Sequence, residues 1–238
     1  MMGWSAASAD AAQRTYATTI HDLMRAPGLG ALQQYAYITL YDHVRFGRWD
    51  KILESSQPPA DLLYPNGVWH YARGRAFVAK DMLKDAQREL DDLKVIAAKD
   101  TLEKVTVMDI NTMKQLLGIA TAVLSGELAA KNKNVDAAVK DLTEALRIEG
   151  TLKYNEPVDW LYPVRHSLGA VLLEGGRAAD AEKVYLEDLK ENPENGWSVI
   201  GLTKSYEAQY KAQEAAAAKA RFEKAWKLAD ITISASRF

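Results

Sequence analysis

Apolar residues recur along nearly the whole chain at the spacing of an amphipathic helix. In the stretch 178–191, the positions i, i+3, i+4 and i+8 are apolar and charged residues fill the gaps between them: Ala181, Val184, Tyr185 and Leu189. Paired glycines at 175–176 precede this stretch, and Pro193 follows it. Glycine and proline are typical of helix ends, so the pattern predicts a helix, a short turn, a second helix and a stop.

The same signature recurs at several places in the chain. The most complete copy contains Leu168, Gly169, Leu172, Gly176, Ala181, Tyr185 and Pro193. Two further copies have the same internal spacing: Gly74, Phe77, Ala86 and Leu90, and Gly126, Ala129, Ala138 and Leu142. A degenerate copy contains Leu40, Gly47 and Ile52, and a partial copy contains Leu202, Thr203 and Tyr206. The small residues at 74, 126 and 169 are expected to let each first helix approach its own second helix. A single pair cannot bury its apolar face, so the pattern predicts stacked pairs.

This order of small, aromatic and turn residues resembles the tetratricopeptide repeat (TPR), whose period is about 34 residues. Whole stretches are also similar to bacterial TPR proteins of largely unassigned function: Arg-Phe-Gly-Arg-Trp-Asp at 45–50, and residues 64–74, 160–169 and 192–197. The resemblance covers nearly the entire chain. It implies an all-α fold, a right-handed solenoid of antiparallel helix pairs with about five irregular repeats, and a role in protein interactions.

The predicted organisation is one solenoid over residues 1–238. Its expected parts are a partial repeat at 1–26, repeats at 29–58, 66–98, 99–150, 158–193 and 195–230, and a tail at 231–238 that packs on the last helix. Gly126 follows Gly74 by 52 residues, which predicts an insertion near 94–111 that lengthens helices or adds one. Gly169 follows Gly126 by 43 residues, and the excess falls in the turn-rich stretch 149–160. Because the first helix has no partner before it, the chain is expected to be the carboxy-terminal part of a longer array.

Composition narrows the range of partners. Lys plus Arg number 30 and Asp plus Glu 32, so the net charge of −2 gives no electrostatic reason to expect nucleic acid or an anionic membrane surface. The absence of cysteine excludes disulfides and thiolate-bound metals, and no cofactor is expected. No apolar run approaches the roughly 20 residues of a membrane span. The compartment stays open: a cytoplasm if the start is native, a periplasm if an upstream part is missing.

The sequence contains none of the local motifs of a nucleophile elbow, a phosphate-binding loop or a zinc protease. The four histidines, His21, His43, His70 and His166, have no second histidine at i+3 or i+4, so no helix face presents a metal pair. Gly28-Leu-Gly30 follows a proline and is interpreted as a linker between helices. We therefore expect a protein that is not an enzyme.

In TPR arrays the first helix of each pair lines a concave groove. Carrying the family's groove positions over to this chain gives these candidate partner-binding residues: Tyr37, Tyr41, Arg45, Tyr71, Arg75, His166, Trp197 and Lys204. Tyrosine and arginine are enriched at interaction hot spots, and the expected partner is a protein or peptide. The basic and asparagine residues with which some TPR domains bind a terminal carboxylate are missing.

Two alternatives remain open at this point. Each tyrosine could instead belong to the core between repeats, with its hydroxyl at the rim. The array could also bind a small ligand or a metal, or regulate an enzyme domain. A closed pocket between the second and fourth repeats, lined by His70 or His166 with carboxylates, would favour that alternative.

Overall fold

The computed structural model describes residues 2–238, and this part of the chain contains twelve α-helices, two 3-10 helices and a two-stranded ribbon. The helices that precede the regular pairs are α1 (Ser5–Thr18), η1 (His21–Arg25), α2 (Ala31–Ala36), α3 (Ile38–Arg45) and α4 (Trp49–Leu53). Four longer pairs follow: α5 (Leu63–Ala79) with α6 (Leu83–Ala97), α7 (Met113–Lys131) with α8 (Val135–Glu149), α9 (Val164–Glu174) with α10 (Ala178–Glu191), and α11 (Gly196–Ala208) with α12 (Ala212–Ala225). The predicted all-α class is confirmed.

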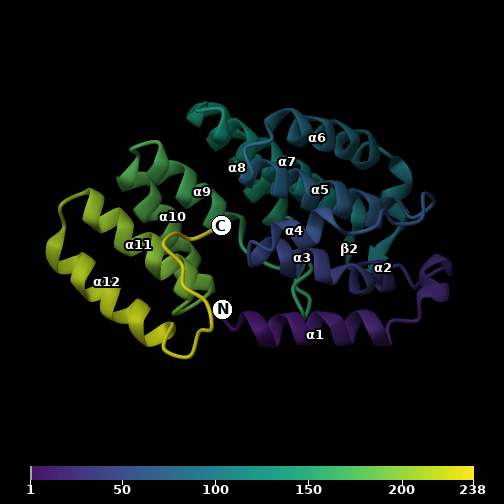
Figure 1. The fold of residues 1–238 in the computed structure, drawn as a ribbon, viewed down its shortest axis with the longest axis horizontal. Helices are drawn as coiled ribbons and strands as arrows, with labels where there is room; N and C mark the ends of the chain where they lie inside the picture. Colours follow the sequence, from purple (N-terminus) through teal and green to yellow (C-terminus); the bar gives the residue numbers. More distant parts are fainter. Residues whose placement is uncertain (1) are drawn as a thin grey trace.

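Consecutive helices pack against each other through these four pairs, and the first helices α5, α7, α9 and α11 also contact one another in sequence. Figure 1 shows the pairs following one another from α5 to α12. A continuous apolar core extends through them from Ala31 to Leu202. We call the side formed by α3, α5, α7, α9 and α11 the inner face.

Five helix pairs are joined by three-residue turns with the same backbone geometry. The middle residue of each turn has a positive φ of 59–74°: Gly47, Asp81, Lys133, Gly176 and Tyr210. In each turn the amide after the middle residue donates to the carbonyl five positions earlier, as Arg177 does to Leu172 at 2.8 Å. This is the hydrogen bond of a Schellman helix end. The middle residues are 34, 52, 43 and 34 positions apart, which are the spacings that the glycine pattern indicates.

Glycines allow close contacts between helices, but not all with the partners expected. A Cβ atom at Gly126 would lie 2.7 Å from Leu142 of α8, and one at Gly169 would lie 2.4 Å from Tyr185 of α10, so both glycines face their own second helix. Gly74 differs, because a Cβ atom there would lie 2.4 Å from Leu124 of α7. That glycine therefore brings α5 close to the first helix of the next pair.

The two insertions form irregular structure. After α6 the chain forms η2 (Asp100–Lys104) and the strands β1 (Thr106–Val107) and β2 (Asn111–Thr112), which pair antiparallel with Val107 opposite Asn111. The first insertion thus adds a short 3-10 helix and a ribbon, and the helix that follows it, α7, has 19 residues, against 11 in α9 and 13 in α11. The second forms segment 150–163, which has no helix or strand.

The two ends of the described chain meet. Helix α1 packs against α3 and α2, and the carboxylate of Asp230 accepts hydrogen bonds from the first amides of α1, Ser5 at 2.6 Å and Ala6 at 2.7 Å. Segment 231–238, which we call the tail, turns back from α12 toward the middle of the molecule and ends near α9 (Figure 1). The start of the tail packs on the last helix as expected, since Ile231 and Ile233 share an apolar cluster with Phe222 and Trp226. The rest of the tail extends beyond that helix.

Candidate functional site

Two of the predicted groove tyrosines lie in a buried aromatic cluster. Tyr41 of α3 and Tyr71 of α5 are 1% and 0% exposed, and each ring centroid lies 5.8 Å from that of Trp160 in segment 150–163. The Tyr71 hydroxyl lies 3.1 Å from that of Tyr162 in the same segment. Burial raises the pKa of both Tyr41 and Tyr71. Segment 150–163 thus covers the part of the inner face that was expected to be open.

A buried ion network lies next to this cluster. The Glu127 carboxylate of α7, 1% exposed, is 3.3 Å from Arg75 and 2.7 Å from Arg237 of the tail, and it accepts a 2.7 Å hydrogen bond from Ser167. Burial favours the neutral acid, but Arg237 and Arg75 outweigh it and hold the pKa of Glu127 below its usual value. The predicted groove residue Arg75 is therefore neutralised inside the protein.

His166 of α9 belongs to a second buried network. Its Nδ1 lies 3.0 Å from the Arg45 guanidinium and its Nε2 lies 3.4 Å from Asp188, which also accepts a hydrogen bond from Asn195 at 3.0 Å. Because an arginine can only donate, Nδ1 accepts from Arg45, while Nε2 also lies 2.8 Å from the amide nitrogen of Asn195. Burial lowers the pKa of His166 to about 4. The ring is thus a neutral structural link at neutral pH.

Arg45 and Trp197 are also brought together. The Arg45 guanidinium carbon lies 3.8 Å from the centroid of the Trp197 indole, which is 1% exposed. Burial lowers the pKa of Arg45, while Tyr162 and Asp188 oppose this effect. The other two predicted residues lie elsewhere: Tyr37 packs beside η1 and α2, and Lys204 forms an exposed pair with Glu207 at 2.9 Å.

The tail occupies the inner face between these networks. Ser236 donates to the carbonyl of His166 at 2.7 Å, and its hydroxyl lies 2.7 Å from that of Tyr185. The next residue, Arg237, reaches Glu127 and also pairs with Glu174 at 2.9 Å. The Phe238 ring then packs on Trp197, with centroids 5.7 Å apart. The Ser-Arg-Phe sequence at 236–238 is therefore held through all three side chains.

Segment 150–163 is anchored by hydrogen bonds from two other elements, β2 and α2. Asn111 of β2 donates to Asp159 at 2.7 Å and to the carbonyl of Lys153 at 2.9 Å. On the other side, Gln34 of α2 donates to the carbonyl of Asp159 at 2.8 Å. These contacts hold the segment over the inner face, and they connect the first insertion to the second.

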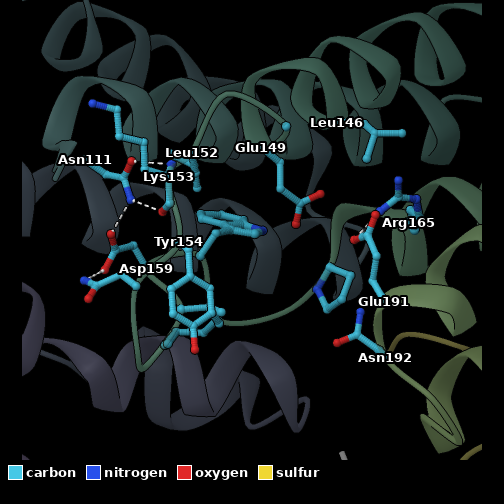
Figure 2. Close-up of a pocket in the computed structure, with 16 residues that line it drawn as sticks. Asn111, Leu146, Glu149, Leu152, Lys153, Tyr154, Asp159, Arg165, Glu191 and Asn192 are labelled. Atoms are coloured by element: carbon cyan, nitrogen blue, oxygen red, sulfur yellow. Dashed lines mark hydrogen bonds and ion pairs between the residues drawn. The ribbon is translucent and has the colours of Figure 1, made fainter.

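A cavity of about 450 Å³ lies beside this segment, at the ends of α8 and α10 and the start of α9. Figure 2 shows the Glu149 side chain directed into the space between the Asn111–Asp159 contact and the pair of Arg165 with Glu191. Burial raises the pKa of Glu149 to about 7, which the backbone N–H of Val164 and the charge of Arg165 only partly offset. This carboxyl group is the acid in the described residues whose pKa is raised furthest toward neutrality.

His70 and His166, which the metal-binding alternative placed at a shared pocket, lie in separate places. His70 Nδ1 lies 2.7 Å from Glu89 at a separate hollow formed by α5 and α6, while His166 is enclosed by Arg45, Asn195 and Asp188. Across residues 2–238, no group of three or more His, Asp or Glu side chains has the arrangement needed to hold a metal ion.

Sequence reasoning did not identify Glu149 or Arg237. Glu149 resembles any acidic residue in a helical polar face until the inserted segment buries it, and the excess of nine residues after α8 was the signal for that segment. Arg237 lies in a short tail without helical periodicity, and its contacts join positions far apart in the sequence. Neither contact could be found from local spacing.

Comparisons with protein-family models, with curated proteins and with solved structures gave no match for this chain. Within residues 2–238, no helix is both long enough and apolar enough to cross a membrane.

Proposed function

We propose that this chain is a TPR-like interaction module whose inner face binds an extended segment of a partner protein. The observation that carries the proposal is the tail, since its Ser236, Arg237 and Phe238 side chains all contact the inner face. The partner segment would present the same order of a small polar residue, an arginine and an aromatic ring. Binding would replace the tail.

The repeated turns support the TPR-like interpretation. Five helix pairs share one turn conformation and one Schellman hydrogen bond, although the middle residue is glycine at only two of the five positions. Such uniformity in dissimilar sequences is typical of a repeated structural unit. The contacts between successive first helices provide the continuous inner surface that a solenoid uses for binding.

The residues proposed to recognise a partner differ from most of those expected from sequence. Tyr41 and Tyr71 hold segment 150–163, so they support the surface from beneath. Glu127 and Glu174 would take the partner's arginine, and Trp197 would take its aromatic ring, as they do for the tail. Arginine binds carboxylates through directed hydrogen bonds, which gives such a site specificity.

A competition experiment tests this function. A fluorescein-labelled peptide with the sequence of residues 231–238 is titrated with the wild-type chain and with the Arg237→Ala variant, and anisotropy is recorded. The attached tail competes at a high effective concentration, on the order of millimolar for a short connection. The variant, whose tail has lost its ion pairs but whose Glu127 is intact, is therefore expected to bind the peptide at least about tenfold more tightly than wild type.

Two controls define the outcome. Arg221→Ala, on α12, removes an exposed ion pair with Glu194 and is expected to leave peptide binding at the wild-type level. A peptide with alanine in place of its arginine is expected to bind the Arg237→Ala variant at least about tenfold more weakly. Equal binding of both peptides, or no binding to the folded variant, contradicts the proposed recognition.

A further inference from the structure

The cavity beneath segment 150–163 has the size of a small-molecule site. Its volume of about 450 Å³ lies within the range of about 300–1,000 Å³ that is typical of ligand pockets. Its walls come from the end of α8, the inserted segment, the start of α9 and the end of α10. The inserted segment that enlarges this repeat therefore also forms the cavity.

The Glu149 carboxylate in this cavity has few partners. Within residues 2–238 its hydrogen bonds come from a single donor, the backbone N–H of Val164, at 3.2 and 3.4 Å from its two oxygens. A carboxylate has about four acceptor positions, and burying it without partners is costly. Arg165, whose charge acts on Glu149, is itself engaged by Glu191 at 3.1 Å. A cation supplied from outside would complete this site.

Aromatic and apolar groups surround the carboxylate. Trp160, 4% exposed, lines the cavity, and its indole N–H has no hydrogen-bond partner in the described part of the chain. Leu146, Leu152 and Leu161 form apolar parts of the wall. Tyr154, 79% exposed, stands at the edge of the same space (Figure 2). Aromatic faces attract cations, and apolar walls favour a ligand with an apolar body.

We propose that this cavity binds a small protonated amine with an apolar body, with the ammonium on the Glu149 carboxylate and the body against Trp160. An anion is disfavoured because it would meet Glu149 and Glu191. Of the two cations of the wall, Arg165 is engaged by Glu191, and the Lys153 side chain is directed away from Glu149 (Figure 2). The unpartnered indole N–H of Trp160 would accommodate a hydrogen-bond acceptor on the ligand. This inference is independent of the proposed peptide site, since the residues that line the cavity differ from those that hold the side chains of Ser236, Arg237 and Phe238.

Calorimetry with three fragments of matched shape tests the charge. The probes are 2-phenylethylamine, the neutral 2-phenylethanol and the anionic 3-phenylpropanoate. For a fragment of this size, a Kd on the order of 1 mM or tighter is expected for the amine. The alcohol and the anion are expected to bind at least about tenfold more weakly, because they cannot pair with the carboxylate. Nα-acetyl-lysine amide carries the same ammonium on a peptide-like body. Comparing it with 2-phenylethylamine shows whether the natural ligand is a free amine or a lysine side chain of a protein.

Variants and pH give an independent readout. Glu149→Gln is expected to weaken amine binding at least about tenfold, while Glu144→Gln, an exposed position on the same helix, leaves it unchanged. The charges that act on Glu149 are those of Arg165, Asp188 and Glu191, and Lys153 and Asp159 also line the cavity. Because the pKa of Glu149 is about 7, binding at pH 6 is expected to release close to one proton and to be about tenfold weaker than at pH 8.

The outcomes are decisive in both directions. Selective binding of the amine that is lost in Glu149→Gln supports the site, and tighter binding of 2-phenylethylamine than of Nα-acetyl-lysine amide assigns it to a free amine. Equal binding of all three fragments, unchanged amine binding in Glu149→Gln, or no heat with about 10 mM amine overturns it. Failure of the peptide competition experiment leaves these results unaffected.

Discussion

Arg237 of the tail and Glu127 of α7 form an ion pair inside the molecule, with Nη1 and Oε2 2.7 Å apart. Arg75 lies on the other side of the same carboxylate, at 3.3 Å. Glu127 therefore holds two arginines from distant parts of the sequence, and its buried charge connects the tail to the first helices of the array. The two arginines do not depend on Glu127 equally, because Arg237 also pairs with the exposed Glu174.

This arrangement predicts unequal effects of removing the partners. Glu127→Ala leaves Arg75 buried without its counter-charge and is expected to lower the free energy of unfolding by about 3–5 kcal/mol. Arg237→Ala leaves Glu127 paired with Arg75 and is expected to cost less, about 1–2 kcal/mol. Urea unfolding followed by circular dichroism measures both, with the exposed Arg221→Ala as a control expected within about 0.5 kcal/mol of wild type. Equal losses for the first two variants would show that the tail pair is as important as the internal one.

The close approach of helices around Tyr185 predicts a contrast between two glycines. A Cβ atom at Gly201 of α11 would lie 2.2 Å from the Tyr185 ring, whereas one at Gly118 of α7 would meet nothing closer than 3.5 Å. Gly201→Ala is therefore expected to destabilise the protein by about 1–3 kcal/mol through overpacking. Gly118→Ala is expected to stabilise it by about 0.5–1 kcal/mol through helix propensity. Thermal unfolding of both variants checks the prediction, and a stable Gly201→Ala protein would argue against the packing of α10 on α11.

The turn geometry predicts a second contrast in stability, between the middle residues of two turns, Tyr210 and Gly176. Tyr210 has a φ of 59° and is 95% exposed, so its side chain gains little from burial and its backbone is strained. Tyr210→Gly is expected to stabilise the protein by up to about 1 kcal/mol, while Gly176→Ala, at the equivalent place in another turn, is expected to destabilise it by a similar amount. Opposite signs in thermal unfolding support one common turn. A loss of stability in Tyr210→Gly would contradict it.

The helix pairs could be predicted because their determinants are local. Apolar spacing along 178–191 predicts a helix whatever the rest of the chain does, and the Gly176 turn recurs in the structure with the predicted spacings. The turns centred on Asp81, Lys133 and Tyr210 show that glycine is not required there, so counting glycines alone underestimates the repeat.

The candidate site could not be predicted to the same extent, because its contacts are between distant segments. The groove positions carried over from the TPR pattern do converge for Tyr41, Tyr71, Arg75 and His166, but all four side chains are buried. Their cover consists of segment 150–163 and the tail, which have no periodic pattern and whose course depends on tertiary contacts such as Asn111 with Asp159. The spacing along the helices indicated that these four residues lie near one another. It did not indicate that segment 150–163 and the tail cover them.

Two groups with shifted pKa values, the buried His166 and the half-buried Glu149, predict opposite dependences of stability on pH. His166 has a folded pKa of about 4, below its ordinary 6.5, so its contribution is fully present above pH 6.5 and is lost as pH falls toward 4. Glu149 has a folded pKa of about 7, above its ordinary 4.5, so its contribution is fully present below pH 4.5 and is lost as pH rises through 7. Each amounts to at most about 3 kcal/mol, less for Glu149 because it is partly exposed to solvent.

Between pH 4.5 and 7 these two contributions oppose each other, so removing one reveals the other. In the Glu149→Gln variant the free energy of unfolding is expected to rise with pH across this window by about 2–3 kcal/mol more than in wild type, because only the His166 contribution remains. Urea unfolding at four or five pH values measures the difference between the two proteins, in which the other titrating groups cancel. Glu223→Gln, an exposed position on α12, serves as the control and is expected to follow wild type. Parallel curves for wild type and Glu149→Gln would show that Glu149 is ionised and well solvated in the folded protein, and would remove the electrostatic reason for a cation in the cavity.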